Sequence, residues 1–84
     1  MKVIFSNHAK ARMEERGNIT DEQVKDAIEN GVSQTTKDER EEFEFSVPYN
    51  NVHNGTFYPN VLLKVIVKKE DDTYIVITVI PKFY

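Results

Sequence analysis

The amino-acid sequence predicts an α+β domain in which two N-terminal helices pack on a three- to four-stranded antiparallel sheet. Before Gly31, apolar residues recur at helical spacing; after it, they alternate with polar residues as in strands. The connecting segments look short except for one polar stretch, and neither repeats nor a linker are visible. Helices followed by strands are typical of one layered unit, so residues 1–84 are expected to form a single domain.

The first predicted helix begins after Ser6 or Asn7, either of which can cap it, and runs to about Arg16. Gly17 followed by Asn18 favours a left-handed stop at its end. The apolar side of this helix carries Phe5, Ala9 and Met13. Arg16 falls between these residues, so its side chain is expected to point toward the core or the rim of a cleft.

The second predicted helix has clearer boundaries. Thr20 as N-cap and Gln23 three residues later match a capping box, while Ile19 and Val24 match a hydrophobic staple. Gly31 closes the helix after residue 30. Its apolar stripe consists of Val24, Ala27 and Ile28.

A change of period after Gly31 predicts the first strands. Phe43, Phe45 and Val47 alternate with polar residues, which indicates a half-buried strand that Pro48 should end. Residues 33–37 are expected to pair with it through a turn at residues 38–40. Residues 49–59 are polar and rich in Asn, and they are expected to form a loop that carries His53.

Residues 61–69 and 73–80 predict the strongest pair of strands. A three-residue loop puts Lys69 opposite Thr73 and Lys64 opposite Thr78, and it gathers the apolar residues on one face. A two-residue loop would mix the two faces, so three residues are preferred. The predicted core is Ala9, Met13, Val24, Ile28, Leu63, Val65, Ile75, Ile77 and Val79.

Composition restricts the class of function. The chain has no Cys, which excludes disulfides and thiolate metal sites. Its net charge of −3 does not favour a polyanion partner, so any nucleic-acid surface must be a local patch. No signal peptide or long apolar run is visible, so a cytoplasmic location without membrane contact is expected.

The most informative segment is the first helix, which spaces His8, Arg12 and Arg16 four residues apart. Residues at this spacing stand above one another on one side of a helix. A histidine can move a proton near neutral pH, and two guanidiniums can hold a phosphate. The alternative is an ordinary helix surface, in which His8 is a cap or surface residue and the arginines pair with acids such as Glu15.

Two segments together resemble a known family. They are His8-Ala9-x-x-Arg12-Met13-x-x-Arg16-Gly17-x-Ile19 and the last strand Ile77-Thr78-Val79-Ile80-Pro81. The sequence resembles a small bacterial and phage family catalogued as a domain of unknown function. That family is generally grouped with RelE-like toxins, in a superfamily of metal-independent ribonucleases that includes barnase-like and colicin-type enzymes. An extra residue, Asn18, and the acidic composition depart from the pattern.

The resemblance implies a RelE-like, microbial ribonuclease-like fold and a catalytic set. His8, Arg12 and Arg16 match the polar positions of the helix motif, and Thr78 matches the final-strand position. Lys64 occupies a strand position where related toxins often carry a basic residue. RNA cleavage without metal needs a base for the 2′-OH, cations for the phosphate and an acid for the leaving 5′ oxygen. The implied activity is that of a toxin-like endoribonuclease without cofactor or metal.

Alternatives remain open at this point. The same fold could be a non-catalytic protein-interaction module of a phage or mobile element, or it could bind RNA without cutting it. Candidate partners are RNA, a cognate antitoxin or another protein. His53 could contribute to catalysis, and Tyr49, Phe57 and Tyr58 could stack bases or simply cover a thin core. The acidic stretch 38–44 reads as a solvated edge, a mimic of nucleic acid or a surface for a basic partner. No zinc-ligand spacing, phosphate loop or nucleophile elbow is present.

Overall fold

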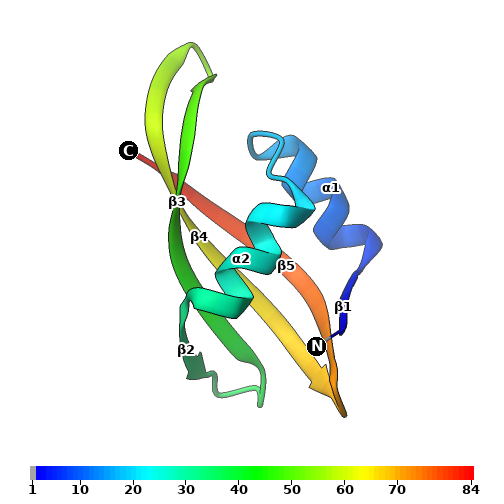
Figure 1. The fold of residues 1–84 in the computed structure, drawn as a ribbon. Helices are drawn as coiled ribbons and strands as arrows, with labels where there is room; N and C mark the ends of the chain where they lie inside the picture. Colours follow the sequence, from blue (N-terminus) through cyan, green and yellow to red (C-terminus); the bar gives the residue numbers. More distant parts are fainter. Residues whose placement is uncertain (1) are drawn as a thin grey trace.

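The structure is a computed structural model that describes residues 2–84, so Met1 lies outside the described residues. It is an α+β fold of two helices and a five-stranded sheet in the order β1-β5-β4-β3-β2 (Figure 1). The elements are β1 (Lys2–Phe5), α1 (Asn7–Glu15), α2 (Asp21–Asn30), β2 (Val32–Thr35), β3 (Glu41–His53), β4 (Thr56–Glu70) and β5 (Thr73–Phe83).

The sheet is mixed rather than wholly antiparallel, which corrects the prediction of three to four antiparallel strands. β2 to β5 pair antiparallel, but β1 pairs parallel with the start of β5, from Lys2 opposite Thr73 to Phe5 opposite Val76. Four residues at the chain start are too few to display an alternating pattern, so this strand was not predicted. The chain then passes through both helices and three strands before β5 completes the parallel pair.

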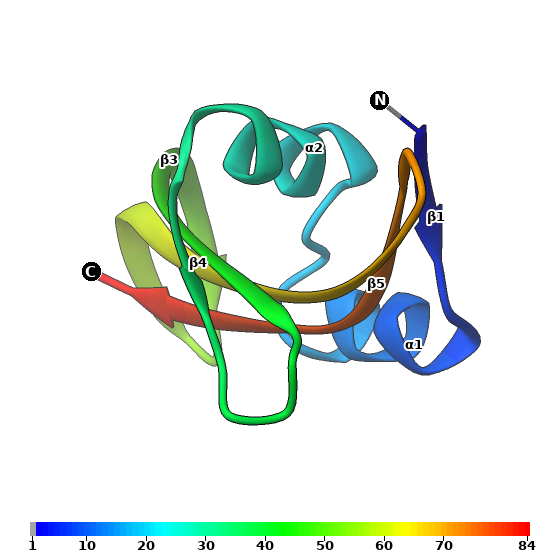
Figure 2. The same ribbon diagram turned by 90° about the horizontal axis from the view of Figure 1, so that it is seen from below.

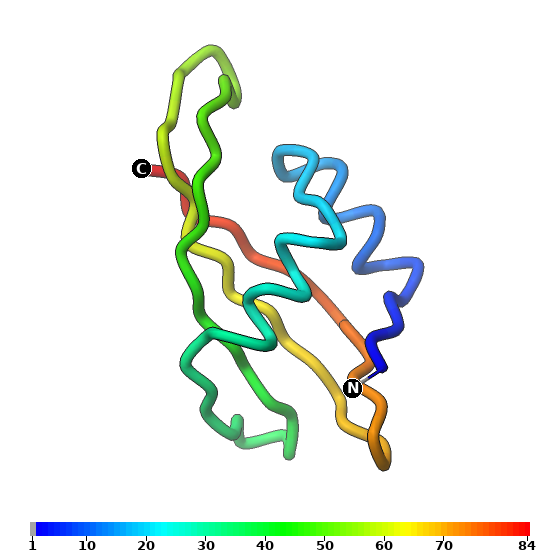
Figure 3. The backbone as a smooth tube through the Cα atoms, in the orientation of Figure 1, coloured from blue at the N-terminus to red at the C-terminus, as the bar shows by residue number. Residues whose placement is uncertain are grey.

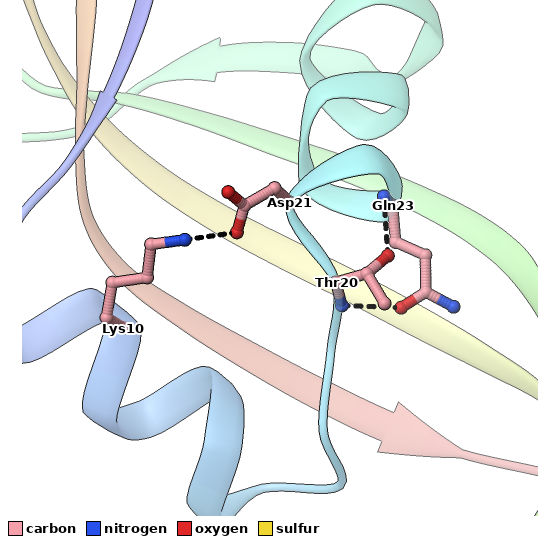
Figure 4. Close-up of polar contacts among 4 residues, drawn as sticks. All are labelled: Lys10, Thr20, Asp21 and Gln23. Carbon is pink, nitrogen blue, oxygen red and sulfur yellow. Dashed lines mark hydrogen bonds and ion pairs between the residues drawn. The ribbon is translucent and has the colours of Figure 1, made fainter.

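Both helices are confirmed, with their predicted caps. Ser6 is the N-cap of α1 and accepts a hydrogen bond from the backbone N–H of Ala9. Thr20 and Gln23 form the predicted capping box of α2, with both reciprocal hydrogen bonds in place (Figure 4). The left-handed stop after α1 is also confirmed, because Gly17 and Asn18 both have positive φ.

The core lies between the helices and one face of the sheet. α2 lies in the concave side of the curved sheet against β3 and β4, and α1 lies along β5 (Figure 2). The fully buried side chains of the sheet include Val61, Leu63, Val65, Val67, Val76 and Val79. From the helices and their connection come Ala9, Met13, Ile19, Val24, Ala27 and Ile28.

The turn between β4 and β5 differs from the prediction. Glu70 pairs with Thr73, so the turn has two residues, of which Asp71 is left-handed. A two-residue turn was expected to mix apolar and polar residues on both faces of the sheet. A β-bulge in β5 prevents this mixing. Ile66 pairs with Thr78 while Val67 pairs with Val76, so Ile77 is the extra residue.

The bulge changes which residues of β5 are buried. Val76 and Val79 are both fully buried, one on each side of the bulge. Ile75 and Ile77, which were predicted in the core, are only half-buried. The bulge also moves Lys64 opposite Ile80 rather than Thr78, so the predicted pairing of those two site residues is wrong.

Residues 49–59 form a long hairpin, not a loop, which corrects a second prediction. β3 continues through Pro48 to His53 with a bulge between Pro48 and Asn51, and it turns at Asn54-Gly55. Beyond Glu44 the strand has no β2 partner, so at Pro48 a missing N–H is tolerated on its free side. Figure 3 shows this hairpin extending past the connection between the helices.

Candidate functional site

Helix α1 lies where β1 ends and takes over part of the hydrogen bonding of β5. The Ser6 N–H donates to the Val76 oxygen at 3.1 Å, and the Ser6 hydroxyl lies 3.4 Å from the Ile77 oxygen. At the C-cap of the helix, Arg16 Nη1 donates to the Val79 oxygen at 3.0 Å. Arg16 is half-buried, as its position between apolar residues predicted. Its guanidinium therefore fixes the C-terminal end of α1 against β5.

The two flanks of α1 face different parts of the molecule. Lys10 forms an ion pair with Asp21 at the start of α2, so this flank faces α2 (Figure 4). At about 100° per residue, Arg12 and His8 lie roughly 60° and 100° from buried Ala9 in the direction opposite to Lys10. His8 is exposed and Arg12 is half-buried, with 40% of its side chain accessible. They stand on the flank of α1 that is turned away from α2.

Thr78 and Lys64 also lie on the side turned away from α2. Thr78 pairs with Ile66 of β4, and Lys64 is two residues before it on the same strand face. Val65 and Val67, which alternate with them, are fully buried under the helices. The side chains of Thr78 and Lys64 therefore belong to the outer face of the sheet, beside the flank that carries His8 and Arg12.

Lys64 is held by two acids of β3. Its Nζ lies 3.1 Å from Glu42 Oε1 and 3.7 Å from Glu44 Oε1. The hydrogen-bonding contact with Glu42 and then its charge raise the pKa of Lys64 above its ordinary 10.5, with a smaller contribution from Glu44. An ammonium whose pKa is raised stays protonated at neutral pH. Lys64 can therefore bind an anionic group but cannot act as a general base.

A titration of the lysines tests this pairing. In 13C-labelled protein, the Lys64 side chain should titrate at higher pH than exposed lysines. The stabilisation from this contact is present below pH 10.5 and is lost as the pH rises through the raised pKa. Glu42→Gln should bring the Lys64 pKa back toward its ordinary value, whereas Glu22→Gln on α2 should not. An unchanged Lys64 titration in Glu42→Gln would show that the ion pair is not formed.

Four of the predicted site residues therefore lie on α1, at its C-cap or on the neighbouring strand β5, and the fifth, Lys64, lies on β4. His8, Arg12 and Thr78 lie toward the same side, and Arg16 lies at the junction of α1 and β5. Arg12 makes an exposed ion pair with Glu15 at 2.9 Å, as the alternative interpretation expected. Such a pair is weak, so a phosphate can displace the carboxylate. Lys64 shares the outer face but is drawn toward β3. The catalytic roles of all five stay predictions.

An aromatic cluster at the C-terminal end of α1 was missed by sequence analysis. Phe83 lies at its centre, with ring centroids 4.7 Å from Tyr49, 4.4 Å from His53 and 5.5 Å from Tyr58. The Tyr49 hydroxyl donates to the Gly17 oxygen at 3.0 Å. The cluster therefore fastens the β3–β4 hairpin to the end of α1, and His53 has a packing partner in it. The sequence signal for this cluster was the presence of Tyr49 and Tyr58 in one short segment, but that segment was predicted to be a loop.

Charge is divided unevenly along the chain. Residues 21–44 contain nine Asp and Glu against three Lys and Arg, a net charge of −6. The rest of the chain contains five acids against eight bases, a net charge of +3. The acidic part forms α2, β2 and the start of β3, while α1, the β3–β4 hairpin and the end of β5 belong to the other part (Figure 1). The overall net charge of −3 therefore combines a strongly acidic segment with a mildly basic remainder of the chain.

Within residues 2–84, no three His, Asp or Glu side chains are grouped so that they could hold a metal ion. Neither helix of the described residues is both long enough and apolar enough to span a bilayer.

Comparison with known proteins gives one family. A family model described as "Domain of unknown function (DUF4258)" matches residues 5–81, which is nearly the whole chain. The match includes α1, where His8, Arg12 and Arg16 lie, and it extends to Pro81 of β5. No match was found among curated proteins or among solved structures.

Proposed function

This chain belongs to the DUF4258 family, a domain family of unknown function. From the arrangement of the residues on α1 and β5, we propose that it is a toxin-like, metal-independent ribonuclease. The proposal includes kinship with RelE-like toxins in fold and site, and an intracellular RNA as substrate. The same proposal includes a cognate antitoxin as the protein partner.

One observation carries the proposal. The flank of α1 that is turned away from α2 carries an exposed imidazole and a partly exposed guanidinium, four residues apart, beside the outer face of the sheet where Thr78 lies. This flank belongs to the part of the chain with net positive charge. A proton-transfer group next to phosphate-binding groups is the arrangement that acid–base cleavage of RNA requires.

The residues divide the chemistry between them. His8 takes the proton from the 2′-OH, which attacks the adjacent phosphorus, and the leaving 5′ oxygen takes a proton from a water molecule as its P–O bond breaks. Arg12 holds a phosphate oxygen after leaving Glu15. Arg16 keeps one N–H on the Val79 oxygen and has further donors in its fork for the phosphate. Thr78 donates a hydrogen bond, and Lys64, protonated at neutral pH, contributes its charge by exchanging Glu42 or Glu44 for the phosphate.

Expression in cells tests the proposal at the level of function. Induced synthesis of the intact chain should arrest growth, and His8→Ala should relieve the arrest at equal protein level. Lys10→Ala, on the opposite flank of α1, is the matched control and should arrest growth like the wild type. Growth arrest that persists in His8→Ala would point to a cause other than this site.

A protein-interaction module is the second candidate, and a specific surface favours it. β2 is an edge strand whose four residues are all exposed, Val32 by 78%. An open edge can pair with a strand of another chain. The adjoining acids of residues 38–44 would select a basic partner. A protein that neither cleaves nor binds RNA would favour this function, whereas binding that His8→Ala leaves unchanged would favour RNA binding without cleavage.

A further inference from the structure

The second half of β5 presents a line of side chains on the outer face of the sheet. Val79 is fully buried on the inner face, so its neighbours Thr78 and Ile80 face outward. The alternation continues to Lys82, whose cross-strand partner Leu62 lies between two fully buried residues of β4. Both helices of residues 2–84 pack on the inner face, so neither covers this line. The line begins at a predicted site residue and leads away from it along β5.

Lys82 is a cation in uncharged surroundings. It is exposed, and within residues 2–84 it forms no ion pair. Leu62 lies opposite to it on β4, and Ser46 follows at the same level on β3. Its neighbours on the same face of β5 are Ile80 and Tyr84, which are also uncharged. An exposed ammonium without a carboxylate partner is available to bind an anionic group such as a phosphate.

Tyr84 adds an aromatic ring to the same face. Its N–H donates to the Asn60 oxygen at 3.0 Å, and the Asn60 N–H donates to the Tyr84 oxygen at 2.9 Å, so Tyr84 continues the pairing of β5 with β4. Its hydroxyl forms a hydrogen bond with the Ser46 hydroxyl of β3, so the side chain crosses β4 on the outer face. Tyr84 is nonetheless 54% exposed. A ring that is held at both ends and open to solvent is suited to stacking against a flat ligand.

This surface continues from the proposed phosphate-binding groups. The Arg16 guanidinium donates to the Val79 oxygen, at the free edge of β5. β1 pairs only with residues 73–76, so no strand separates Arg16 from the outer face at this level. Lys82 is three residues beyond Val79, roughly 10 Å at the rise of a strand, and its ammonium is carried on a flexible stem. One short stretch of polynucleotide can therefore contact both Arg16 and Lys82.

We propose that Lys82 and Tyr84 form a second subsite for a single-stranded RNA that runs along the outer face of β5, with a phosphate on Lys82 and a base stacked on Tyr84. This inference rests on the proposed function, and it adds the substrate class, a single strand longer than the dinucleotide unit that is cleaved. Stacking requires an unpaired base, which a duplex does not offer. A ring two residues from an unpaired cation fits the alternation of neutral bases and anionic phosphates.

The salt dependence of binding, measured by anisotropy, tests the phosphate contact. The ligand is a single-stranded 2′-O-methyl oligonucleotide, which lacks the nucleophilic 2′-OH and therefore stays intact. Lys82→Ala should weaken binding and make the plot of log affinity against log salt shallower by about 0.7, the contribution of one phosphate contact on a single strand. Lys37→Ala removes another exposed lysine without an ion pair, in the acidic part of the chain, and should leave the slope unchanged. An unchanged slope in Lys82→Ala would overturn the phosphate contact.

Substitutions of Tyr84 test the stacking. Tyr84→Ala should weaken binding of the oligonucleotide by roughly 5- to 100-fold, the usual effect of losing one stacked base, whereas Tyr84→Phe keeps the ring and should bind within a few-fold of the wild type. The ring is mostly exposed, so both variants should fold and melt nearly like the wild type. The chain contains no Trp, so Tyr84→Trp adds a single reporter that the single strand should quench and the same sequence as a duplex should not. Equal binding by wild type and Tyr84→Ala, or equal quenching by the duplex, would overturn the stacking.

The outcomes separate this subsite from the proposed function. If cleavage depends on His8, and Lys82→Ala raises the KM of a long RNA but not that of a dinucleotide, both stand. If cleavage depends on His8 but neither Lys82→Ala nor Tyr84→Ala changes binding, the subsite is wrong and the ribonuclease stands. If binding depends on Lys82 and Tyr84 and no cleavage occurs, the subsite stands and the protein is an RNA-binding domain. If the oligonucleotide does not bind at low salt, the subsite is wrong.

Discussion

His8→Ala is expected to lower the rate of RNA cleavage by roughly 10²–10⁴-fold, the usual contribution of a group that transfers a proton in the transition state. His8 is exposed on the second position of α1, so its loss should leave the fold intact. The rate is measured on a labelled RNA with purified protein, and the melting temperature is measured in parallel.

Two control variants make this result specific to His8. Lys10→Ala removes an exposed ion pair with Asp21 on the other flank of α1, and it should leave the rate within a few-fold of the wild type. His53→Ala removes the ring stacked on Phe83, so it should lower stability more than His8→Ala does. A His8→Ala protein that cleaves RNA at the wild-type rate would remove His8 from the proposed mechanism.

Gly17→Ala is expected to lower the free energy of unfolding by roughly 3–5 kcal/mol, more than the matched substitution Gly55→Ala. Gly17 has φ of +112°, a conformation that residues with a side chain rarely adopt. A Cβ added there would lie 2.6 Å from Phe83 Cζ and 3.0 Å from the Tyr49 hydroxyl. The substitution would therefore strain the backbone and displace the aromatic cluster. Chemical denaturation measures the free energy of unfolding.

Gly55→Ala separates the two causes. Gly55 also has positive φ, at +81°, but an added Cβ there meets nothing within 4 Å. Only the backbone cost remains, about 1–2 kcal/mol. If Gly17→Ala and Gly55→Ala lose the same stability, the close packing of Gly17 against Phe83 does not contribute.

The helices could be predicted from sequence because their signals are local. The capping box of Thr20 and Gln23, and the glycine stop at Gly17, depend on residues a few positions apart. The pairing of β1 with β5 is different, since it joins residues about 70 positions apart and leaves no local pattern. The bulge at Ile77 also has no local signal, because the sheet was free to keep its apolar face either by a longer turn or by an extra residue in β5.

In the candidate site too, some features follow from local sequence signals and others depend on long-range strand pairing. The common flank of His8 and Arg12, and the half-buried position of Arg16, follow from the 3.6-residue period of a helix. The contact of Lys64 with Glu42, and the packing of His53 on Phe83, depend on strand register and on a hairpin that was predicted as a loop. Asn-rich sequence and Pro48 suggested that loop, but an unpaired side of β3 tolerates both.

Analysis of the products of RNA treated with purified protein is the most direct test of the proposed ribonuclease. In the presence of EDTA, with and without ribosomes, RNA fragments should appear that end in 2′,3′-cyclic phosphate, because the 2′-OH is the nucleophile. They should be nearly absent with His8→Ala. If the wild-type protein produces no fragments under either condition and binds no RNA at low salt, the catalytic function is contradicted and the interaction module replaces it.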